Sequence, residues 1–295
     1  MRAKMEISKS LPQNPIQQDV KGGRLRFYPI PLGVTYGALP QTYEQPGGLA
    51  DAFTGLLGDG DPLDALDLSS ALRGEGAPGA PHPPPSPRVG DVYPLALVGA
   101  LALVDGGEAD WKLVGVRRDD PLLGGLACVS QLLAPEEVMG AQELLGRAPA
   151  AARFLAAAAA AGAAGGEAPP PPPLPPAAAA AGRARLLAAA AFFSAYKKRD
   201  PGDAREPSPV SFAFEGRWLD APGAAAVALQ GYAHWCALVQ GALKAAQARA
   251  DRDAMGRARG HLVHCHDRLD RAHVAEEAAH GVILEGVEGV PNLWV

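Results

Sequence analysis

Acidic side chains gather at two places in the sequence where their spacing suits metal chemistry. The first is G-D-G-D-P-L-D at residues 58–64, whose carboxylates surround the turn-forming Gly60 and Pro62. The second, D-G-G-E-A-D-W-K at residues 105–112, follows directly after the apolar run 95–104. Taken alone, such a segment is more often a solvated acidic loop or a helix N-cap than a metal site. Two acidic clusters at strand ends can converge on one cavity, however, and together they favour metal ligation.

Oxygen ligands without a nearby His or Cys pair suit Mg²⁺, which keeps several waters and shares its shell with substrate phosphates. Arginine contacts a phosphate as a planar fork and lysine as a point charge. Basic and phenolic groups that could serve in this way are Lys4, Arg26, Tyr36, Lys112, Tyr196 and Lys197. Carboxylates for Mg²⁺ together with cationic donors predict phosphoryl-transfer chemistry.

Short apolar runs bounded by Gly, Pro or Asp predict the strands that position these groups. The runs are residues 24–28, 65–68, 95–104, 111–116 and 211–214. A long helix is predicted from Pro222 onward, because apolar residues recur there at roughly helical spacing. Its apolar stripe comprises Val227, Tyr232, Trp235, Leu238 and Leu243, and His234 and Trp235 are expected in the core. The pattern predicts a small β-rich core closed by one helix.

The order of these motifs resembles that of the family I soluble inorganic pyrophosphatases, in their longer eukaryotic and plastid form. The resemblance spans residues 1 to about 240 and is carried by K-M-E-I at 4–7, N-P-I-Q-Q-D-V-K-G-G-R-L-R-F at 14–27, Y-G-A-L-P-Q-T-Y-E at 36–44, the two acidic segments, F-F-S-A-Y-K at 192–197 and F-A-F-E-G at 212–216. The signature D-x-D-P-x-D followed by D-x-x-x-x-D-W-K is too specific to arise by chance.

The resemblance implies a fold, an activity and a role for each matching residue. The fold is mainly β with α, a five-stranded closed β-barrel of OB type with flanking helices. The activity is Mg²⁺-dependent hydrolysis of inorganic pyrophosphate to two orthophosphates, with Asp61 as the general base for a metal-activated water. The implied metal ligands are Asp59, Asp64, Asp105, Asp110 and Glu6. The implied phosphate-binding groups are Lys4, Arg26, Tyr36, Lys112, Tyr196 and Lys197.

The chain departs from the family pattern in two ways. Family members carry a segment with an active-site glutamate before the K-x-E motif, so we expect this chain to be N-terminally truncated. They also have a tyrosine where Leu32 stands. Tyr28 shares a strand face with Arg26 and could replace that tyrosine, although a packed or exposed aromatic is favoured. The departures keep open an alternative, a catalytically impaired pyrophosphatase-like fragment or a non-catalytic subunit.

Two low-complexity segments, at about residues 74–88 and 150–182, are interpreted as surface insertions that bury no apolar face. A proline-rich interaction scaffold is the third hypothesis, since residues 169–176 read P-P-P-P-P-L-P-P. The predicted domains are a pyrophosphatase-like barrel over residues 1–240 and a helical C-terminal extension over 241–295. Five histidines in that extension are interpreted as surface residues, not a zinc site.

Composition limits the partners. The 295 residues carry 27 Lys+Arg against 32 Asp+Glu, a net charge of −5, which argues against nucleic acid as a partner. No apolar run is long enough to span a bilayer, and no secretory signal is visible. Three cysteines without C-x-x-C spacing favour a reducing compartment. We therefore expect a cytoplasmic protein, or a plastid one if the natural start lies upstream, and the resemblance favours a homodimer.

Overall fold

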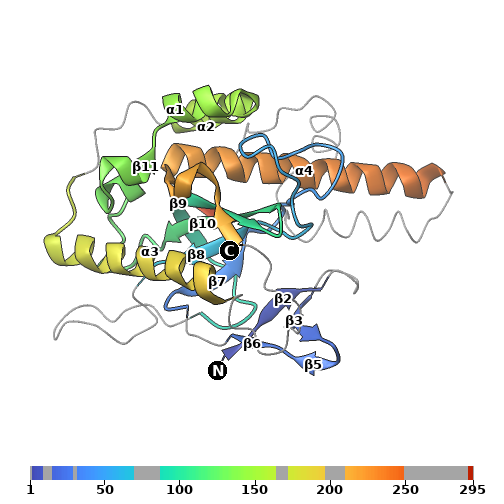
Figure 1. Ribbon diagram of the computed structural model, residues 1–295, viewed down its shortest axis with the longest axis horizontal. Helices are drawn as coiled ribbons and strands as arrows, with labels where there is room; N and C mark the ends of the chain where they lie inside the picture. The colour runs from blue at the N-terminus through green and yellow to red at the C-terminus, as the bar shows by residue number, and fades with distance from the viewer. Residues whose placement is uncertain are drawn as a thin grey trace.

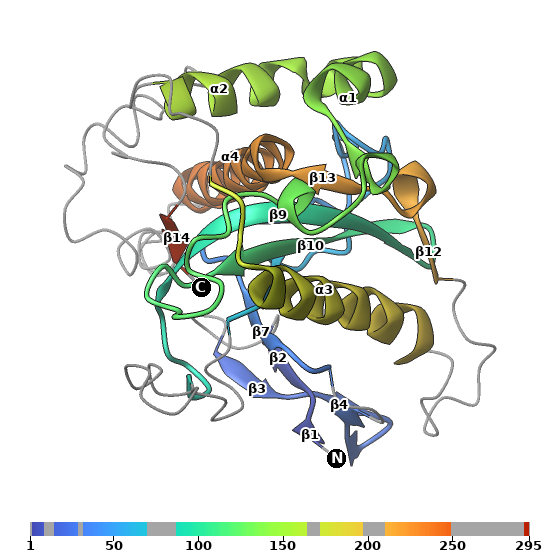
Figure 2. The ribbon, with the colours of Figure 1, turned by 90° about the vertical axis from the view of Figure 1, so that its left-hand side faces the viewer.

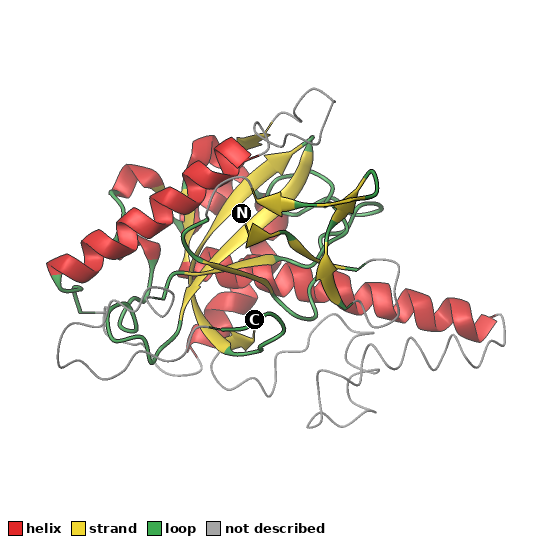
Figure 3. Cartoon of the chain, turned by 90° about the horizontal axis from the view of Figure 1, so that it is seen from below, coloured by secondary structure: helices red, strands yellow, loops and turns green. Residues whose placement is uncertain are grey.

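The computed structural model describes residues 2–8, 15–28, 32–69, 87–163, 172–196, 210–248 and 292–294. They form a mixed α/β arrangement in which helices flank a central sheet (Figures 1 and 3). The helices are α1 (Ala141–Arg147), α2 (Ala152–Ala163), α3 (Pro176–Tyr196) and α4 (Ala221–Ala248). Short 3-10 turns are Val129–Gln131, Pro135–Glu137, Pro149–Ala151 and η6 (Ala213–Gly216). Figure 2 shows α4 and then α2 on one side of the sheet and α3 on the other.

The sheet is built around two long strands, β9 (Pro94–Asp105) and β10 (Glu108–Val116), which form an antiparallel hairpin. Its strand order is β11-β13-β9-β10-β8-β7, with β12 and β14 also paired to β9. The shorter members are β7 (Thr35–Ala38), β8 (Asp64–Asp67), β11 (Val138–Met139), β12 (Val210–Phe212), β13 (Trp218–Asp220) and β14 (Asn292–Trp294). The parallel pairing of β8 with β10 sets Asp64 directly beside Lys112, so the two predicted acidic segments meet in the sheet.

Strand β9 is buried on both faces, which explains its unbroken apolar run. One face packs with Phe192 and Phe193 of α3 in a cluster that includes Val98 and Leu101. The other face contributes Ala100 to a cluster with residues of α2 and α4. Burial on both sides makes this hairpin the rigid part of the molecule that carries the second acidic segment.

Six short strands near the N-terminus form three antiparallel pairs below the main sheet (Figure 1). The pairs are β1 (Arg2–Ala3) with β6 (Phe27–Tyr28), β2 (Met5–Ile7) with β3 (Ile16–Gln18), and β4 (Val20–Lys21) with β5 (Arg24–Leu25). Gly22 and Gly23 connect the last pair with positive φ values of 57° and 76°, which glycine adopts without steric cost. These pairs carry the K-x-E motif and Arg26 toward the sheet.

Each predicted strand has a counterpart in the structure, with shifted ends. The last one was wrong in part: residues 210–212 form β12, but Phe214 lies in η6 with a φ of 54°. The mixture of strands and helices is confirmed. In the described strands no pairing joins β7 back to β11, so the closed five-stranded barrel stays a prediction.

The interpretation of residues 150–182 as an insertion without a buried face was wrong for its helical parts. Residues 152–163 form α2, where Phe154 and Leu155 are each only 7% exposed. Phe154 stacks on Phe53 at a centroid distance of 6.5 Å. In α3, Ala178 is buried. A few large side chains suffice to form a buried face, because the surrounding alanines let the helices approach their neighbours closely. The composition of the segment did not reveal this.

The apolar stripe of α4 was also predicted in the wrong place. Val227 and His234 are buried as expected, but Leu238 is 47% exposed and Trp235, which stacks on Tyr232, is only half-buried. The side chain of Leu243 lies outside the described part. Small residues replace the large ones at the interface, since a Cβ on Gly231 would lie 2.5 Å from Leu63 Cδ1. The helix continues unbroken across residue 240, and the proposed domain boundary there stays a prediction.

Among the described helices, none combines the length and the apolarity needed to cross a membrane.

Candidate functional site

The first acidic segment is a tight loop pressed between two other parts of the chain. Gly58 donates its N–H to Gln45 O at 2.8 Å and bridges to Ala109 of β10. A Cβ on Gly58 would lie 2.3 Å from the backbone carbon of Glu44, so only glycine fits there. Gly60 has a φ of 82°, and the N–H of Asp61 donates to Asp59 Oδ1 at 2.9 Å. These constraints hold the loop carboxylates in place beside β10.

Three carboxylates from three different segments converge at this loop. Oxygens of Glu44, Asp59 and Asp110 lie within 4.8 Å of one another, the single set of this kind among the described residues. Glu44 is 6% exposed, and the side chain of Asp110 is 13% exposed. Such crowding of buried negative charge is costly unless protons or cations neutralise it.

Electrostatics in the cluster reflect that crowding. Burial, followed by the charges of Asp110 and Asp61, raises the pKa of Asp59 to about 6. Burial, followed by the charges of Asp110 and Asp59, holds the pKa of Glu44 well above its usual range. In the metal-free protein these groups therefore hold protons more tightly than ordinary carboxyls, and a cation can take the place of those protons.

Lys112 supplies the positive charge nearest to the cluster. Its side chain is 3% exposed, and its ammonium donates hydrogen bonds to both Asp64 and Asp110. Burial lowers the pKa of Lys112, but the two carboxylates outweigh it and hold the pKa well above the usual range. The ammonium also lies 4.9 Å from the centre of the Phe193 ring. Lys112 thus links the two predicted acidic segments into one charged site.

Tyr36 connects the cluster to the N-terminal strands. Its hydroxyl donates to Asp64. Burial, and then the charges of Asp64, Tyr28, Asp110 and Glu6, hold the pKa of the Tyr36 phenol well above its usual range. The phenol is therefore a neutral hydrogen-bond donor at physiological pH. It lies between Asp64 and Asp110 on one side and Glu6 of the N-terminal strands on the other.

The N-terminal strands carry a second group of charges. Lys4 Nζ lies 2.5 Å from Glu6 Oε1 and 3.5 Å from Asp19 Oδ2. Arg26 Nη1 donates to the same Asp19 oxygen at 2.6 Å. Burial raises the pKa of Asp19, but Lys4 and Arg26 together bring it below its usual value. Asp19 aligns the two cations side by side, an arrangement suited to a polyanion.

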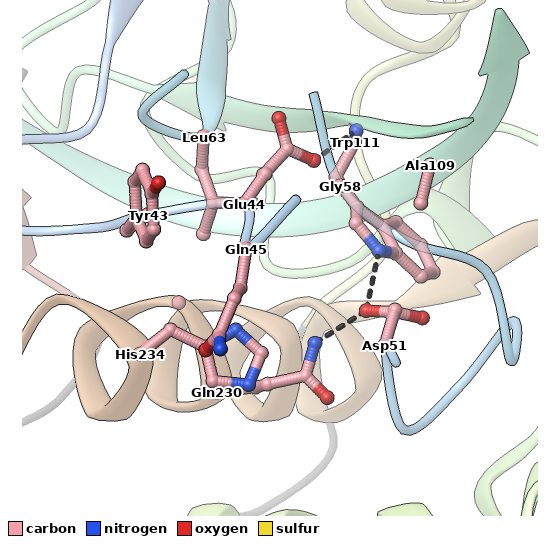
Figure 4. Close-up of a pocket in the computed structure, with 11 residues that line it drawn as sticks. Tyr43, Glu44, Gln45, Asp51, Gly58, Leu63, Ala109, Trp111, Gln230 and His234 are labelled. Carbon is pink, nitrogen blue, oxygen red and sulfur yellow. Dashed lines mark hydrogen bonds between the residues drawn. The ribbon is translucent and has the colours of Figure 1, made fainter. Parts of the chain in front are cut away.

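A hydrogen-bond network behind Glu44 fixes the orientation of its carboxylate (Figure 4). The backbone N–H of Trp111 donates to Glu44 Oε1 at 2.7 Å, and its indole Nε1 donates to Asp51 Oδ2 at 3.1 Å. Gln230 of α4 donates to the same Asp51 oxygen. Helix α4 therefore helps to hold the segment that contains Glu44.

The structure places the predicted site residues unevenly. It brings Asp59 together with Asp110, and Asp64 together with Asp110 through Lys112. Asp64 does not belong to the set of three carboxylates, so the expected convergence of Asp59, Asp64 and Asp110 on one shell holds only in part. Asp105 lies half-buried at the end of β9. The side chain of Tyr196 and the whole of Lys197 lie outside the described residues.

Sequence reasoning missed Glu44 and Asp19. Both stand in motifs that carried the resemblance, Y-G-A-L-P-Q-T-Y-E and N-P-I-Q-Q-D, but neither received a role. Glu44 lies in a loop six residues beyond the end of β7, and its hydrogen-bond partner is the backbone of Trp111. The position of that partner, in β10, was not visible in the sequence.

Comparison with known proteins agrees with these motifs. The family model for inorganic pyrophosphatase matches residues 1–79. A soluble inorganic pyrophosphatase of Chlamydomonas reinhardtii, named chloroplastic, is 43% identical over 119 residues, which cover 40% of this chain and 37% of that protein. A chloroplastic Arabidopsis thaliana counterpart is 37% identical over 120 residues, 41% of this chain and 35% of that protein.

Over this N-terminal part, the chain is similar to the soluble inorganic pyrophosphatases. In these two alignments it matches little more than a third of the length of its relatives. A recombinant pyrophosphatase from T brucei brucei is similar in structure, with a TM-score of 0.51 and 26% identity over 81% of this chain and 51% of that one. The fold of a type I pyrophosphatase from P falciparum is also similar, with a TM-score of 0.52 and 22% identity over 85% of this chain and 60% of that one. The similarity in fold thus extends beyond the matched N-terminal residues.

Proposed function

We propose that this chain hydrolyses inorganic pyrophosphate to two orthophosphates, using Mg²⁺ as its cofactor. The observation that carries the proposal is the buried set of carboxylates around Asp59 and Asp110, with Lys112 beside it. Similarity of the N-terminal part to inorganic pyrophosphatases supports the choice of substrate.

The residues of the cluster fit a hard divalent cation. All three offer carboxylate oxygens, the ligand type that Mg²⁺ prefers. One buried oxygen, Oε2 of Glu44, has no hydrogen-bond partner, as expected for a group that completes a metal shell. When bound, the cation polarises phosphate oxygens and lowers the pKa of a water molecule. Asp59, Asp64 and Asp110 would hold it, with Asp105 and Glu6 serving the metals that arrive with the substrate.

Asp61 is the proposed general base. Its backbone oxygen accepts a hydrogen bond from Glu44 N at 2.8 Å, which anchors it in the loop next to Asp59. The Asp61 carboxylate would take the proton of the attacking water as the new phosphorus–oxygen bond forms and the bridging bond of pyrophosphate breaks. A positioned base of this kind typically contributes about 10²- to 10⁴-fold.

The cationic and phenolic groups would hold the two phosphates. Lys112 and Tyr36 lie at the carboxylate cluster, and Lys4 and Arg26 lie together at Asp19. The charges of Glu6 and Asp110 both act on Tyr36, which supports a single site between the two groups. We assign Tyr196 and Lys197 to the same task on the resemblance alone.

Three further properties are proposals. The bend between Val114 and Gly115, where the β9–β10 register shifts, supports closure of the sheet into an OB-type barrel. Because two relatives are named chloroplastic, we propose a plastid location as an alternative to a cytoplasmic one. The homodimer is proposed from the resemblance.

Release of orthophosphate from pyrophosphate by the purified full chain tests the proposal. We expect turnover that requires Mg²⁺ and is lost in excess chelator. A chain that binds Mg²⁺ and pyrophosphate without releasing phosphate would instead be the non-catalytic subunit. Leu32 and Tyr28 bear on that outcome, because Leu32 stands in place of the family tyrosine and Tyr28 could substitute for it. Both side chains pack against the core, and the Tyr28 ring contacts the Phe192 ring edge-on at a centroid distance of 5.5 Å.

A further inference from the structure

Glu44 is a buried carboxylate that is satisfied on only one side. Its side chain is 6% exposed, and Oε1 accepts the Trp111 N–H at 2.7 Å. Oε2 is buried and has no hydrogen-bond partner. Burying an anionic oxygen without a partner is costly, because it loses its hydration and gains no compensating charge or hydrogen bond. Lys112, the nearby cation, directs its hydrogen bonds to Asp64 and Asp110 instead.

The surroundings of Glu44 indicate what the missing partner is. Oxygens of Glu44, Asp59 and Asp110 lie within 4.8 Å of one another. Two oxygens bound to one Mg²⁺ at about 2.1 Å are at most about 4.2 Å apart. Neighbouring ligands of an octahedral Mg²⁺ lie only about 3.0 Å apart. Groups separated by as much as 4.8 Å therefore need to close in by up to about 1.8 Å to share an ion.

We infer that Glu44 is a ligand of the divalent cation held by Asp59 and Asp110. The inference rests on the proposed function, because it takes the cation of that site as given, and it adds a residue to which sequence reasoning gave no role.

The backbone around Glu44 is built to keep its side chain at the site. Glu44 N donates to Asp61 O and Gly60 N donates to Glu44 O, both at 2.8 Å, so the residue is paired with the acidic loop on both sides. Trp111 fixes Oε1 and is itself held by Asp51. A purely structural role needs Oε1 alone and gives no reason for an anion at Oε2.

The variant Glu44→Gln separates the two roles. Gln keeps an oxygen that can accept the Trp111 N–H, and it replaces the unpartnered Oε2 with an uncharged amide. We expect Mn²⁺ affinity, measured by electron paramagnetic resonance on the full chain, to fall at least about tenfold. The thermal midpoint of the metal-free variant should equal or exceed that of the wild type, because one of three adjoining buried carboxylates is gone.

Glu136→Gln is the matched control, since it removes one negative charge at an exposed position far along the chain. It should bind Mn²⁺ as the wild type does. Unchanged Mn²⁺ affinity in Glu44→Gln would overturn the inference, whatever the phosphate-release assay shows. Tight Mn²⁺ binding that depends on Glu44, without phosphate release, would instead sustain it and refute the proposed function.

A second measurement does not depend on the variant folding. In a crystal of the wild-type chain soaked with Mn²⁺, anomalous scattering should place the ion about 2.1 to 2.3 Å from Glu44 Oε2. An ion bound to Asp59 and Asp110 that leaves Glu44 outside its shell would contradict the inference.

Discussion

At the residue scale, the site is a balance of buried charge. Three clustered carboxylates and Asp64 are compensated by one buried ammonium, that of Lys112. A buried pair contributes little net stability when intact, but its loss leaves an uncompensated charge. This asymmetry makes Lys112 important for the fold, in addition to its proposed role in phosphate binding.

Replacement of Lys112 by Met should therefore destabilise the metal-free chain, by about 3 to 5 kcal/mol in urea unfolding. Asp64 and Asp110 would then lose the ammonium that separates them. Added Mg²⁺ should recover part of the loss, because the cation supplies positive charge to the same carboxylates. Lys21→Met, at an exposed position, is the control. Equal stability of Lys112→Met and the wild type would show that the carboxylates are protonated without the lysine.

The raised pKa of Asp59 predicts a pH dependence of stability. Its pKa is about 6 in the folded chain against 3.8 as the reference value. The folded state then binds more protons than the unfolded state between these pH values, so stability falls as pH rises through that window. The stability lost between pH 3.8 and about 6 should be larger in the wild type than in Asp59→Asn by about 2 to 3 kcal/mol. Identical pH profiles in chelator would refute the assignment.

At the element scale, glycines decide how closely the segments of the site approach. Gly58 lets the acidic loop lie against Glu44, and Gly231 lets α4 lie against Leu63. The Gly231 carbonyl accepts the Tyr43 N–H at 3.0 Å, one residue before Glu44. Helix α4 is thus a support of the site, although it contributes no carboxylate to the cluster.

The change Gly231→Ala should destabilise the chain by about 1 to 3 kcal/mol, because the added Cβ meets Leu63 and Thr42 in a filled interface. Gly241→Ala, in the same helix with nothing within 4 Å of its Cβ, should stabilise it by up to about 1 kcal/mol. Chemical unfolding of both variants measures the contrast. The same sign for both changes would mean that α4 is not closely packed at Gly231.

At the scale of the whole molecule, the sequence predicted the strands better than the packing of the helices. The structure brings Asp59, Asp110 and Lys112 close together, as expected from two acidic segments next to strands whose apolar runs are plain in the sequence, and their roles stay predictions. The sequence did not single out Glu44, because its hydrogen-bond partner, Trp111, lies 67 positions away in the sequence. The sequence also did not predict which faces of α2 and α4 are buried, because contacts made by alanine and glycine leave no periodic pattern of large apolar residues.

The central claim is that the buried carboxylates and their cation hydrolyse pyrophosphate, and conversion of pyrophosphate to orthophosphate followed by ³¹P NMR tests it most directly. The wild-type full chain with Mg²⁺ should convert the pyrophosphate signal into that of orthophosphate. Asp61→Asn should slow this by about 10²- to 10⁴-fold, because it removes the proton acceptor while keeping size and polarity. Its Mn²⁺ affinity should remain close to that of the wild type. Equal rates for the two proteins, or an unchanged pyrophosphate signal with the Mg²⁺-bound wild type, would contradict the account.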